Sequence, residues 1–221
     1  MPHWPEEEWF DELRKRVKET AEDQETLLLI LELSCVGEGS PSPLSFKCME
    51  AVRELEEFPH PVIGMVQGEC FDCCLEVAAA CDLLYASRGS SFGLPSGHLP
   101  GLGGTQRLTR IMGLARAKEL YLTGRVWDAD QAHLYGLLNG VSPSREAMCR
   151  EVEEFTDILL SRSPRALTLC KEVVHRGYDL DLRNGCELER EVFSLCFTTH
   201  DQKEGMRAFA EKRKPRFEGL E

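Results

Sequence analysis

The stretch GECFDCCLEVAAACD at residues 68–82 decides the fold, because it lies between two short apolar segments. Residues 62–66 before it read VIGMV and predict a strand, and residues 83–86 after it read LLYA and predict another. The stretch itself carries an apolar run that predicts a helix over residues 72–81. Strand, helix and strand in this order are typical of a parallel βαβ unit.

The same alternation extends toward the N-terminus. Residues 26–33 form an apolar run that predicts a buried strand, and residues 36–45, rich in Gly, Ser and Pro, predict a loop. Two amphipathic helices are predicted, one over residues 6–20 and one that Pro59 and Pro61 stop. The inward-facing side chains are expected to be Trp9, Phe10, Leu13 and Val17 in the first helix and Met49, Val52, Leu55 and Phe58 in the second.

Downstream of Gly103 the pattern changes, and the chain is predicted to be almost wholly helical. The predicted helices cover residues 104–112, 114–122, 128–135, 144–161, 164–176, 181–197 and 201–213. The fold class is therefore α/β, with an α/β core followed by a helical C-terminal region. We place the core at residues 1–160 and the helical region at residues 161–221.

The composition of the 221 residues is that of an ordinary soluble globular protein, with 42% hydrophobic and 29% charged residues. The formal net charge of −12 argues against nucleic acid or an anionic membrane surface as a partner, because both would repel the chain. No apolar run approaches the ~20 residues of a membrane helix, and neither end of the sequence resembles a targeting signal. We therefore expect a cytoplasmic location.

Ten cysteines are scattered mainly through apolar segments. In the absence of a secretory signal, we expect reduced thiols that act as small hydrophobic side chains. The Cys70-x-x-Cys73-Cys74 spacing superficially suggests metal or redox chemistry, but no second Cys/His pair at zinc-finger spacing accompanies it. No bound metal is expected.

Three further motifs are GGTQRL at residues 103–108, LTG at residues 122–124 and DQKEGMRAFAEKRKP at residues 201–215. With these motifs the chain resembles the crotonase superfamily of enoyl-CoA hydratases and isomerases over roughly residues 60–216. The resemblance implies a spiral of ββα and βαβ turns, followed by C-terminal helices that assemble a homotrimer or hexamer. It also implies a coenzyme A thioester as substrate, no permanently bound cofactor, and an oxyanion hole of two backbone N–H groups that stabilises charge on the thioester oxygen.

The resemblance places an oxyanion donor and an acid/base group on the helix after Gly68. The family's glycine run corresponds to Asp72-Cys73-Cys74, which puts the donating backbone N–H at Cys73. Asp72 adds a negative charge there, and is at least as well explained as the N-cap of the helix. Glu76 corresponds to the first catalytic glutamate of the hydratases. Because its helix is otherwise apolar, we expect burial to make Glu76 a general acid or base; the alternative is an exposed helical side chain.

The sequence departs from the family pattern at the remaining site positions. The second hydratase glutamate corresponds to Ser96, which cannot share acid/base work. The next segment is about three residues shorter than in typical hydratases and contains His98, which either acts as an acid or base or is simply solvated. The family's Ala-Gly-x-Asp motif, which supplies the other oxyanion donor, is missing from residues 33–41. We interpret the chain as a divergent member with a shortened N-terminal region.

The C-terminal end retains residues that the resemblance assigns to coenzyme A. Phe209 and Lys212 match family positions that cover the adenine and the phosphates, often from a neighbouring subunit. The cluster of Lys212, Arg213, Lys214 and Arg216 gives an acidic chain a local cationic site for an anionic cofactor. The alternative is a solvated run of charges.

Two functions remain open. The first is an acyl-CoA processing enzyme, an enolate-stabilising lyase, isomerase or decarboxylase that uses Glu76 as its single acid/base. Ser96 disfavours hydration by the usual pair of glutamates. The second is a catalytically degenerate crotonase that acts as a non-enzymatic accessory or scaffold subunit. We favour the enzyme, because Glu76 and the basic C-terminal end are retained.

Overall fold

The computed structural model describes residues 7–23, 26–33, 46–97 and 101–217. Its helices are α1 (Glu7–Glu22), α2 (Phe46–Glu56), α3 (Cys73–Ala78), α4 (Gly104–Met112), α5 (Leu114–Thr123), α6 (Ala129–Leu134), α7 (Arg145–Leu160), α8 (Pro164–Tyr178), α9 (Leu182–Cys196) and α10 (His200–Glu211). Its strands are β1 (Leu29–Leu33), β2 (Val62–Val66), β3 (Glu69–Phe71), β4 (Leu83–Ser87), β5 (Ser91–Gly93), β6 (Val126–Asp128) and β7 (Gly140–Ser142).

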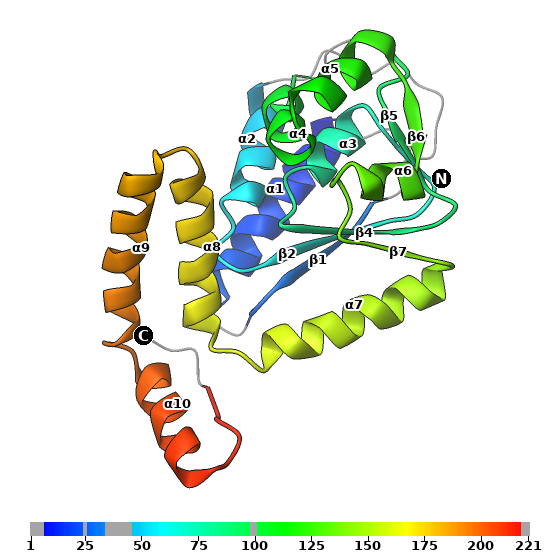
Figure 1. Ribbon diagram of the computed structural model, residues 1–221. Helices are drawn as coiled ribbons and strands as arrows, with labels where there is room; N and C mark the ends of the chain where they lie inside the picture. Colours follow the sequence, from blue (N-terminus) through cyan, green and yellow to red (C-terminus); the bar gives the residue numbers. More distant parts are fainter. Residues whose placement is uncertain (1–6, 24–25, 34–45, 98–100, 218–221) are drawn as a thin grey trace. The chain divides into compact units, whose positions relative to one another are not determined.

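Two sheets form the α/β core. The larger has the strand order β1-β2-β4-β7 and is wholly parallel (Figure 1). Helix α2 connects β1 to β2, and α3 lies between β2 and β4 in the chain, as crossover connections between parallel strands require. The smaller sheet has the order β3-β5-β6, in which β3 and β5 are parallel and β5 and β6 antiparallel. The predicted α/β class is confirmed.

Strand β1 lies at an edge of the larger sheet among the described residues, so the prediction of a buried strand is wrong. Leu33 is buried, whereas Ile30 has 41% of its surface exposed. An apolar run predicts a strand but does not show whether neighbours cover both of its faces.

Four strands were not predicted from the sequence: β3, β5, β6 and β7. Each has three residues, which is too short for an alternating pattern to be read. Strands β6 and β7 interrupt the region that we predicted to be almost wholly helical, and β7 extends the larger sheet beside β4.

The helix predictions are confirmed, and most of the predicted inward side chains are buried. Trp9 and Met49 are exceptions, with exposed fractions of 37% and 45%. In α2 the buried stripe includes Cys48, Ala51 and Val52, at the i, i+3 and i+4 positions of one helix face. Met49 is one residue out of register with that face and therefore points outward.

The chain divides into two compact units, one of residues 1–58 and 62–152 and one of residues 59–61 and 153–221. The first contains both sheets. In the second, α8 and α9 pack side by side (Figure 1). Ser163 caps α8 by accepting a bond from the Ala166 N–H, and its own hydroxyl donates to Asp201 of α10 over 2.6 Å. The boundary that we placed at residue 160 stays a prediction.

None of the helices in the described ranges is long and apolar enough to cross a membrane. In the same ranges, no group of three or more His, Cys, Asp or Glu side chains is arranged to hold a metal ion. Eight of the cysteines that the structure describes have free thiols, as predicted. Cys74 is disulfide-bonded, so the prediction of reduced thiols is wrong at that residue.

Candidate active site

The candidate site lies where two paired strands end. Strands β3 and β5 run parallel with Phe71 beside Gly93, and the Asp72 N–H donates to the Gly93 carbonyl over 3.0 Å. The carboxyl ends of parallel strands meet at one edge of a sheet, so the residues that follow them come together there. Helix α3 begins directly after β3, and its first turn carries Glu76.

Glu76 is buried, with 1% of its surface exposed. Its carboxylate accepts a bond from the Leu102 N–H at 2.6 Å and one from the Tyr121 hydroxyl at 2.9 Å. A charged carboxylate is stable in such a place only when donors replace water. Glu76 is therefore an oriented carboxylate and not an exposed helical side chain.

Burial raises the pKa of Glu76 above its usual value. The N–H groups of Leu102 and Gly104, the Tyr121 hydroxyl and the charge of Arg107 act in the opposite direction, because each stabilises the charged form. A raised pKa suits a group that both accepts and donates a proton near neutral pH.

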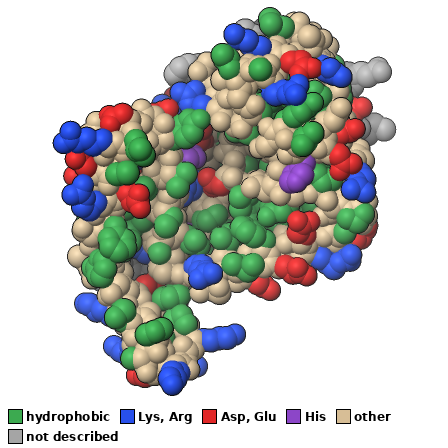
Figure 2. Space-filling view, in the orientation of Figure 1, with side chains coloured by type: hydrophobic (Ala, Val, Ile, Leu, Met, Phe, Trp, Pro, Cys, Tyr) green, Lys and Arg blue, Asp and Glu red, His purple; other side chains and the backbone are tan. Residues whose placement is uncertain are grey.

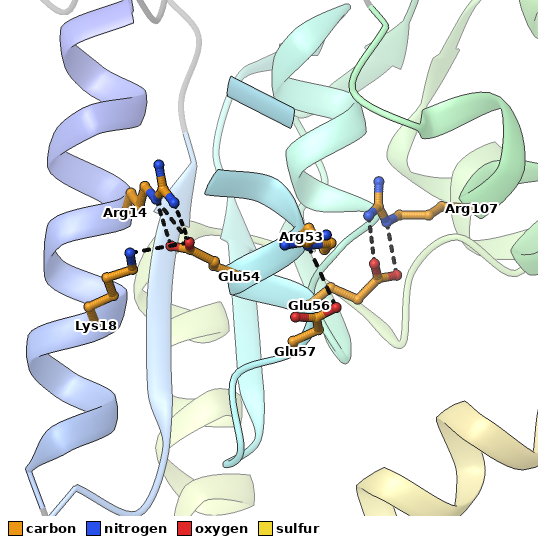
Figure 3. A network of polar contacts seen from close by, with 7 residues as sticks. All are labelled: Arg14, Lys18, Arg53, Glu54, Glu56, Glu57 and Arg107. Carbon is orange, nitrogen blue, oxygen red and sulfur yellow. Dashed lines mark hydrogen bonds and ion pairs between the residues drawn. The ribbon is translucent and has the colours of Figure 1, made fainter. Parts of the chain in front are cut away.

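The loop that supplies the Leu102 N–H is shaped by Gly104 and by Arg107. A Cβ at Gly104 would lie 2.3 Å from Cγ of Glu76 and 2.4 Å from its Oε1, so the close approach requires glycine. Arg107 donates to the Leu102 carbonyl over 2.7 Å. Its guanidinium also forms a two-pronged ion pair with Glu56 of α2, at 2.9 and 2.6 Å (Figure 3).

Cys73 is buried and is the first residue of α3. The backbone N–H groups of a helix's first turn have no carbonyl partner inside the helix. The N–H of Cys73 belongs to this turn, and it is the group that the resemblance assigns to the oxyanion hole. Burial raises the pKa of the Cys73 thiol to about 12, with the negative charges of Asp72 and Glu76 adding to the effect. The thiol is therefore protonated and a poor nucleophile.

Asp72 occupies the N-cap position of α3, but its side chain makes no capping hydrogen bond, so the predicted N-cap contact is absent. The backbone has a φ of 48°, in the left-handed region that favours glycine. The side chain is buried, and it accepts a bond from the Ser96 hydroxyl over 2.5 Å. Ser96 itself is exposed and follows β5.

Two predicted features lie outside the described residues. His98 is one of them, and residues 34–41, where the second oxyanion donor was sought, are the other. The structure therefore brings Cys73, Glu76, Asp72 and Ser96 together at the start of α3 and does not place His98.

At the C-terminal end, Phe209 is exposed, and the Lys212 N–H donates to its carbonyl over 3.2 Å. The basic cluster is only partly available to a ligand. Arg213 pairs with Glu204 at 2.6 Å and with Glu211 at 2.6 Å, and the pair with Arg213 lowers the pKa of Glu204 to about 2. Lys212, Lys214 and Arg216 are exposed cations.

The chain matches the family model described as enoyl-CoA hydratase/isomerase over residues 37–220. It belongs to the enoyl-CoA hydratase/isomerase family. The predicted crotonase resemblance is thus confirmed.

Among curated members of the enoyl-CoA hydratase/isomerase family, a short-chain-enoyl-CoA hydratase of Clostridium acetobutylicum is 40% identical over 165 residues, which cover 73% of this chain and 63% of that protein. One from Clostridioides difficile is 42% identical over 151 residues, covering 67% of this chain and 96% of that protein. A crotonyl-CoA hydratase of Syntrophomonas wolfei is 40% identical, and 64% of its length is covered. The chain therefore spans less than two thirds of the Clostridium acetobutylicum and Syntrophomonas wolfei relatives.

A solved enoyl-CoA hydratase from Geobacillus kaustophilus is 34% identical and superimposes with a TM-score of 0.86, covering 96% of this chain and 88% of that one. Another from Bacillus anthracis is 30% identical, with a TM-score of 0.85 and coverage of 96% and 89%. These similarities confirm that the fold is that of the enoyl-CoA hydratase/isomerase family.

The roles of three residues at the site were not predicted from the sequence. Tyr121 and Arg107 lie on α5 and α4, and Leu102 contributes only its N–H. The GGTQRL motif marks the start of α4, where Arg107 lies. No motif in the sequence indicates that the Tyr121 hydroxyl contacts Glu76. The contact between Asp72 and Ser96 was missed as well, because it depends on the pairing of two three-residue strands.

Proposed function

We propose that the protein processes acyl-CoA thioesters by stabilising an enolate, with Glu76 as the acid/base for the proton at C2 of the acyl chain. One observation carries the proposal: Glu76 is a fully buried carboxylate held by the Leu102 N–H and the Tyr121 hydroxyl, one turn after Cys73. Enolate chemistry needs a group that transfers the C2 proton and a donor that stabilises charge on the thioester oxygen. We assign the first task to the Glu76 carboxylate and the second to the Cys73 N–H.

In the proposed reaction the thioester oxygen accepts a hydrogen bond from the Cys73 N–H. Glu76 exchanges one proton with C2, and the resulting negative charge moves to the thioester oxygen. The donors to Glu76 fix its direction, so that little reorganisation is required during the step. The thiol of Cys73 takes no part, since its pKa is raised to about 12.

The relatives suggest the class of substrate. Those from Clostridium acetobutylicum and Syntrophomonas wolfei are named as hydratases of short-chain enoyl-CoA and crotonyl-CoA. We extend a short acyl-CoA substrate to this chain, with Phe209 and Lys212 as candidate contacts to the adenine and phosphates of coenzyme A. Lys212, Lys214 and Arg216 provide the cations, and Arg213 is occupied by its carboxylate partners.

The test compares the wild-type chain with Glu76→Gln, which keeps the size of the side chain. Binding of butanoyl-CoA is measured by calorimetry, and exchange of its C2 protons with D2O is followed by NMR. We expect both proteins to bind, and the exchange rate of Glu76→Gln to fall by about 100-fold or more.

The alternative, a degenerate crotonase acting as an accessory or scaffold subunit, predicts a different result. Such a protein would bind butanoyl-CoA without exchanging the C2 protons, and Glu76→Gln would change nothing. That outcome would overturn the enzymatic proposal.

A further inference from the structure

Hydration of a 2-enoyl thioester needs two proton transfers, one from the attacking water and one to C2. Glu76 provides for one of them, and Ser96 has no carboxylate. We propose that Asp72, positioned by Ser96, is the second catalytic carboxylate of this site, accepting the proton of the attacking water while Glu76 donates the proton to C2. This inference rests on the proposed function and names the reaction of the same site.

The first argument is position. Asp72 directly follows β3, and Ser96 lies three residues after the end of β5, the strand paired with β3. The pairing brings the Ser96 hydroxyl to 2.5 Å from Oδ1 of Asp72. Ser96 stands where the resemblance expects a glutamate, so its contact puts the Asp72 carboxylate beside that position.

The second argument is that, among the described residues, the Asp72 side chain makes no helix-capping bond that would offset the cost of burying it. Its side chain does not cap α3, although it occupies the N-cap position. It is a carboxylate with 1% of its surface exposed, on a backbone with a φ of 48°. Both features are unfavourable, and such strain is concentrated at functional sites.

The third argument is the relation to Glu76. The Glu76 N–H donates to the Asp72 carbonyl over 3.1 Å, so the two residues are separated by one closed helical turn. Both carboxylates act electrostatically on the Cys73 thiol between them. The two groups therefore flank the residue whose N–H is the proposed oxyanion donor.

Their environments suit different tasks. Burial raises the pKa of Glu76, which favours the protonated, donating form. Asp72 receives a hydrogen bond from the hydroxyl of Ser96, which orients its carboxylate. Two carboxylates in contrasting environments are a recurrent arrangement for an acid and a base.

The step balances without a further reactant. The water oxygen bonds to C3 while Asp72 takes one of its protons, and the C2=C3 electron pair moves to the thioester as an enolate. C2 then takes the proton of Glu76, which gives a 3-hydroxyacyl thioester. A second water returns the proton from Asp72 to Glu76.

The experiment measures two reactions on the full chain: hydration of crotonyl-CoA by absorbance, and exchange of the C2 protons of butanoyl-CoA in D2O. We expect Asp72→Asn to lower kcat for hydration by about 100-fold or more, and to lower exchange much less, because exchange needs only Glu76. Asn is chosen because it tolerates a positive φ. Thermal unfolding monitored by circular dichroism checks that the variant is folded.

Ser96 is a positioning residue, because its hydroxyl orients the Asp72 carboxylate. Variants of Ser96 test the same inference if Asp72→Asn does not fold. Ser96→Ala is expected to lower kcat for hydration by about tenfold with KM unchanged, and Ser96→Thr, which keeps the hydroxyl, to stay within about threefold of wild type.

The experiment distinguishes a failure of the Asp72 inference from a failure of the proposed function. If Asp72→Asn hydrates within about threefold of wild type while Glu76→Gln is inactive, Asp72 is not catalytic and the proposed function stands. If the wild type exchanges C2 protons but does not hydrate crotonyl-CoA, this inference is again overturned alone. If the wild type does neither, the proposed function fails.

Discussion

At the scale of single residues, the site depends on how closely Gly104 and Glu76 approach each other. The carboxylate occupies space that a side chain at residue 104 would fill. The sequence predicted the burial of Glu76, because the residues around it on α3 are apolar. It did not predict what holds the carboxylate, since Tyr121 is 45 residues away in the chain and lies on a helix with no recognisable motif at that position.

Gly104→Ala tests this packing. The new Cβ would displace the Glu76 carboxylate, so we expect the exchange rate to fall by about 10- to 100-fold and the free energy of unfolding to drop by about 1–3 kcal/mol. Urea denaturation and the exchange assay measure the two effects. Gly89→Ala is the control, because a Cβ at Gly89 would meet nothing within 4 Å, and wild-type behaviour is expected for it. An equal loss in both variants would contradict the argument.

Tyr121→Phe tests the electrostatic setting of Glu76. The Tyr121 hydroxyl stabilises the charged carboxylate and so lowers its pKa against the larger effect of burial. Its removal should raise the pKa of Glu76. Exchange requires the ionised form to accept the C2 proton, so the rate should rise with pH through a midpoint that lies higher in Tyr121→Phe than in wild type.

The pH profile of the exchange rate measures that midpoint. Tyr135→Phe is a suitable control, because the Tyr135 ring packs edge-on against Trp127 at 5.1 Å and phenylalanine keeps that contact. A midpoint that moves to lower pH in Tyr121→Phe, or one that moves equally in the control, would show that the hydroxyl does not act on Glu76 as described.

At the scale of elements, α4 is held to α2 by Arg107 and Glu56, and α2 to α1 by Glu54 with Arg14 and Lys18 (Figure 3). The Arg107 side chain is only 15% exposed, and it also holds the Leu102 carbonyl. The Arg53–Glu57 pair in the same view is different, with a separation of 3.7 Å and side chains that are 62% and 65% exposed. Exposed pairs contribute little to stability, whereas partly buried two-pronged pairs contribute more.

We therefore expect Arg107→Ala to lower the free energy of unfolding by about 1.5–3 kcal/mol, and Arg53→Ala to change it by less than about 0.5 kcal/mol. Urea denaturation compares the two variants. Equal destabilisation by both would mean that the bonds of Arg107 to Glu56 and Leu102 make no special contribution.

The elements also show how far the sequence predicts the fold. Long helices were predicted because their periodicity extends over several turns. In the structure, Ser163 and Thr199 accept capping bonds at the starts of α8 and α10. The three-residue strands were missed, and with them the meeting of β3 and β5 that brings Ser96 to Asp72. Short strands are fixed by their partners across the sheet, which lie far away in the chain.

At the scale of the whole molecule, the C-terminal unit leaves large apolar side chains exposed. They include Val174, Tyr178, Leu182, Phe193, Phe197, Met206 and Phe209. Figure 2 shows hydrophobic side chains on the surface of the part of the chain that carries α8, α9 and α10. Extended apolar surface of this kind marks a site of protein association. It agrees with the homotrimer or hexamer that the sequence resemblance implies, which stays a prediction.

Light scattering coupled to size-exclusion chromatography measures the assembly. We expect a mass three or six times the 25.0 kDa of one chain, and a smaller particle for Phe193→Glu, because a charge replaces a side chain that is 60% exposed. Arg183→Gln, a change on the same helix at a residue whose side chain is 87% exposed, serves as the control. A wild-type chain that elutes as a monomer at micromolar concentration would contradict the prediction.

The central claim is that Glu76 transfers a proton to the acyl chain of a thioester. The most direct measurement is an NMR spectrum of butanoyl-CoA incubated with the full chain in D2O. We predict that deuterium replaces the C2 protons with the wild type, and at least about 100-fold more slowly with Glu76→Gln. Butanoyl-CoA that binds to the wild type in calorimetry but is recovered without deuterium at C2 would contradict the account.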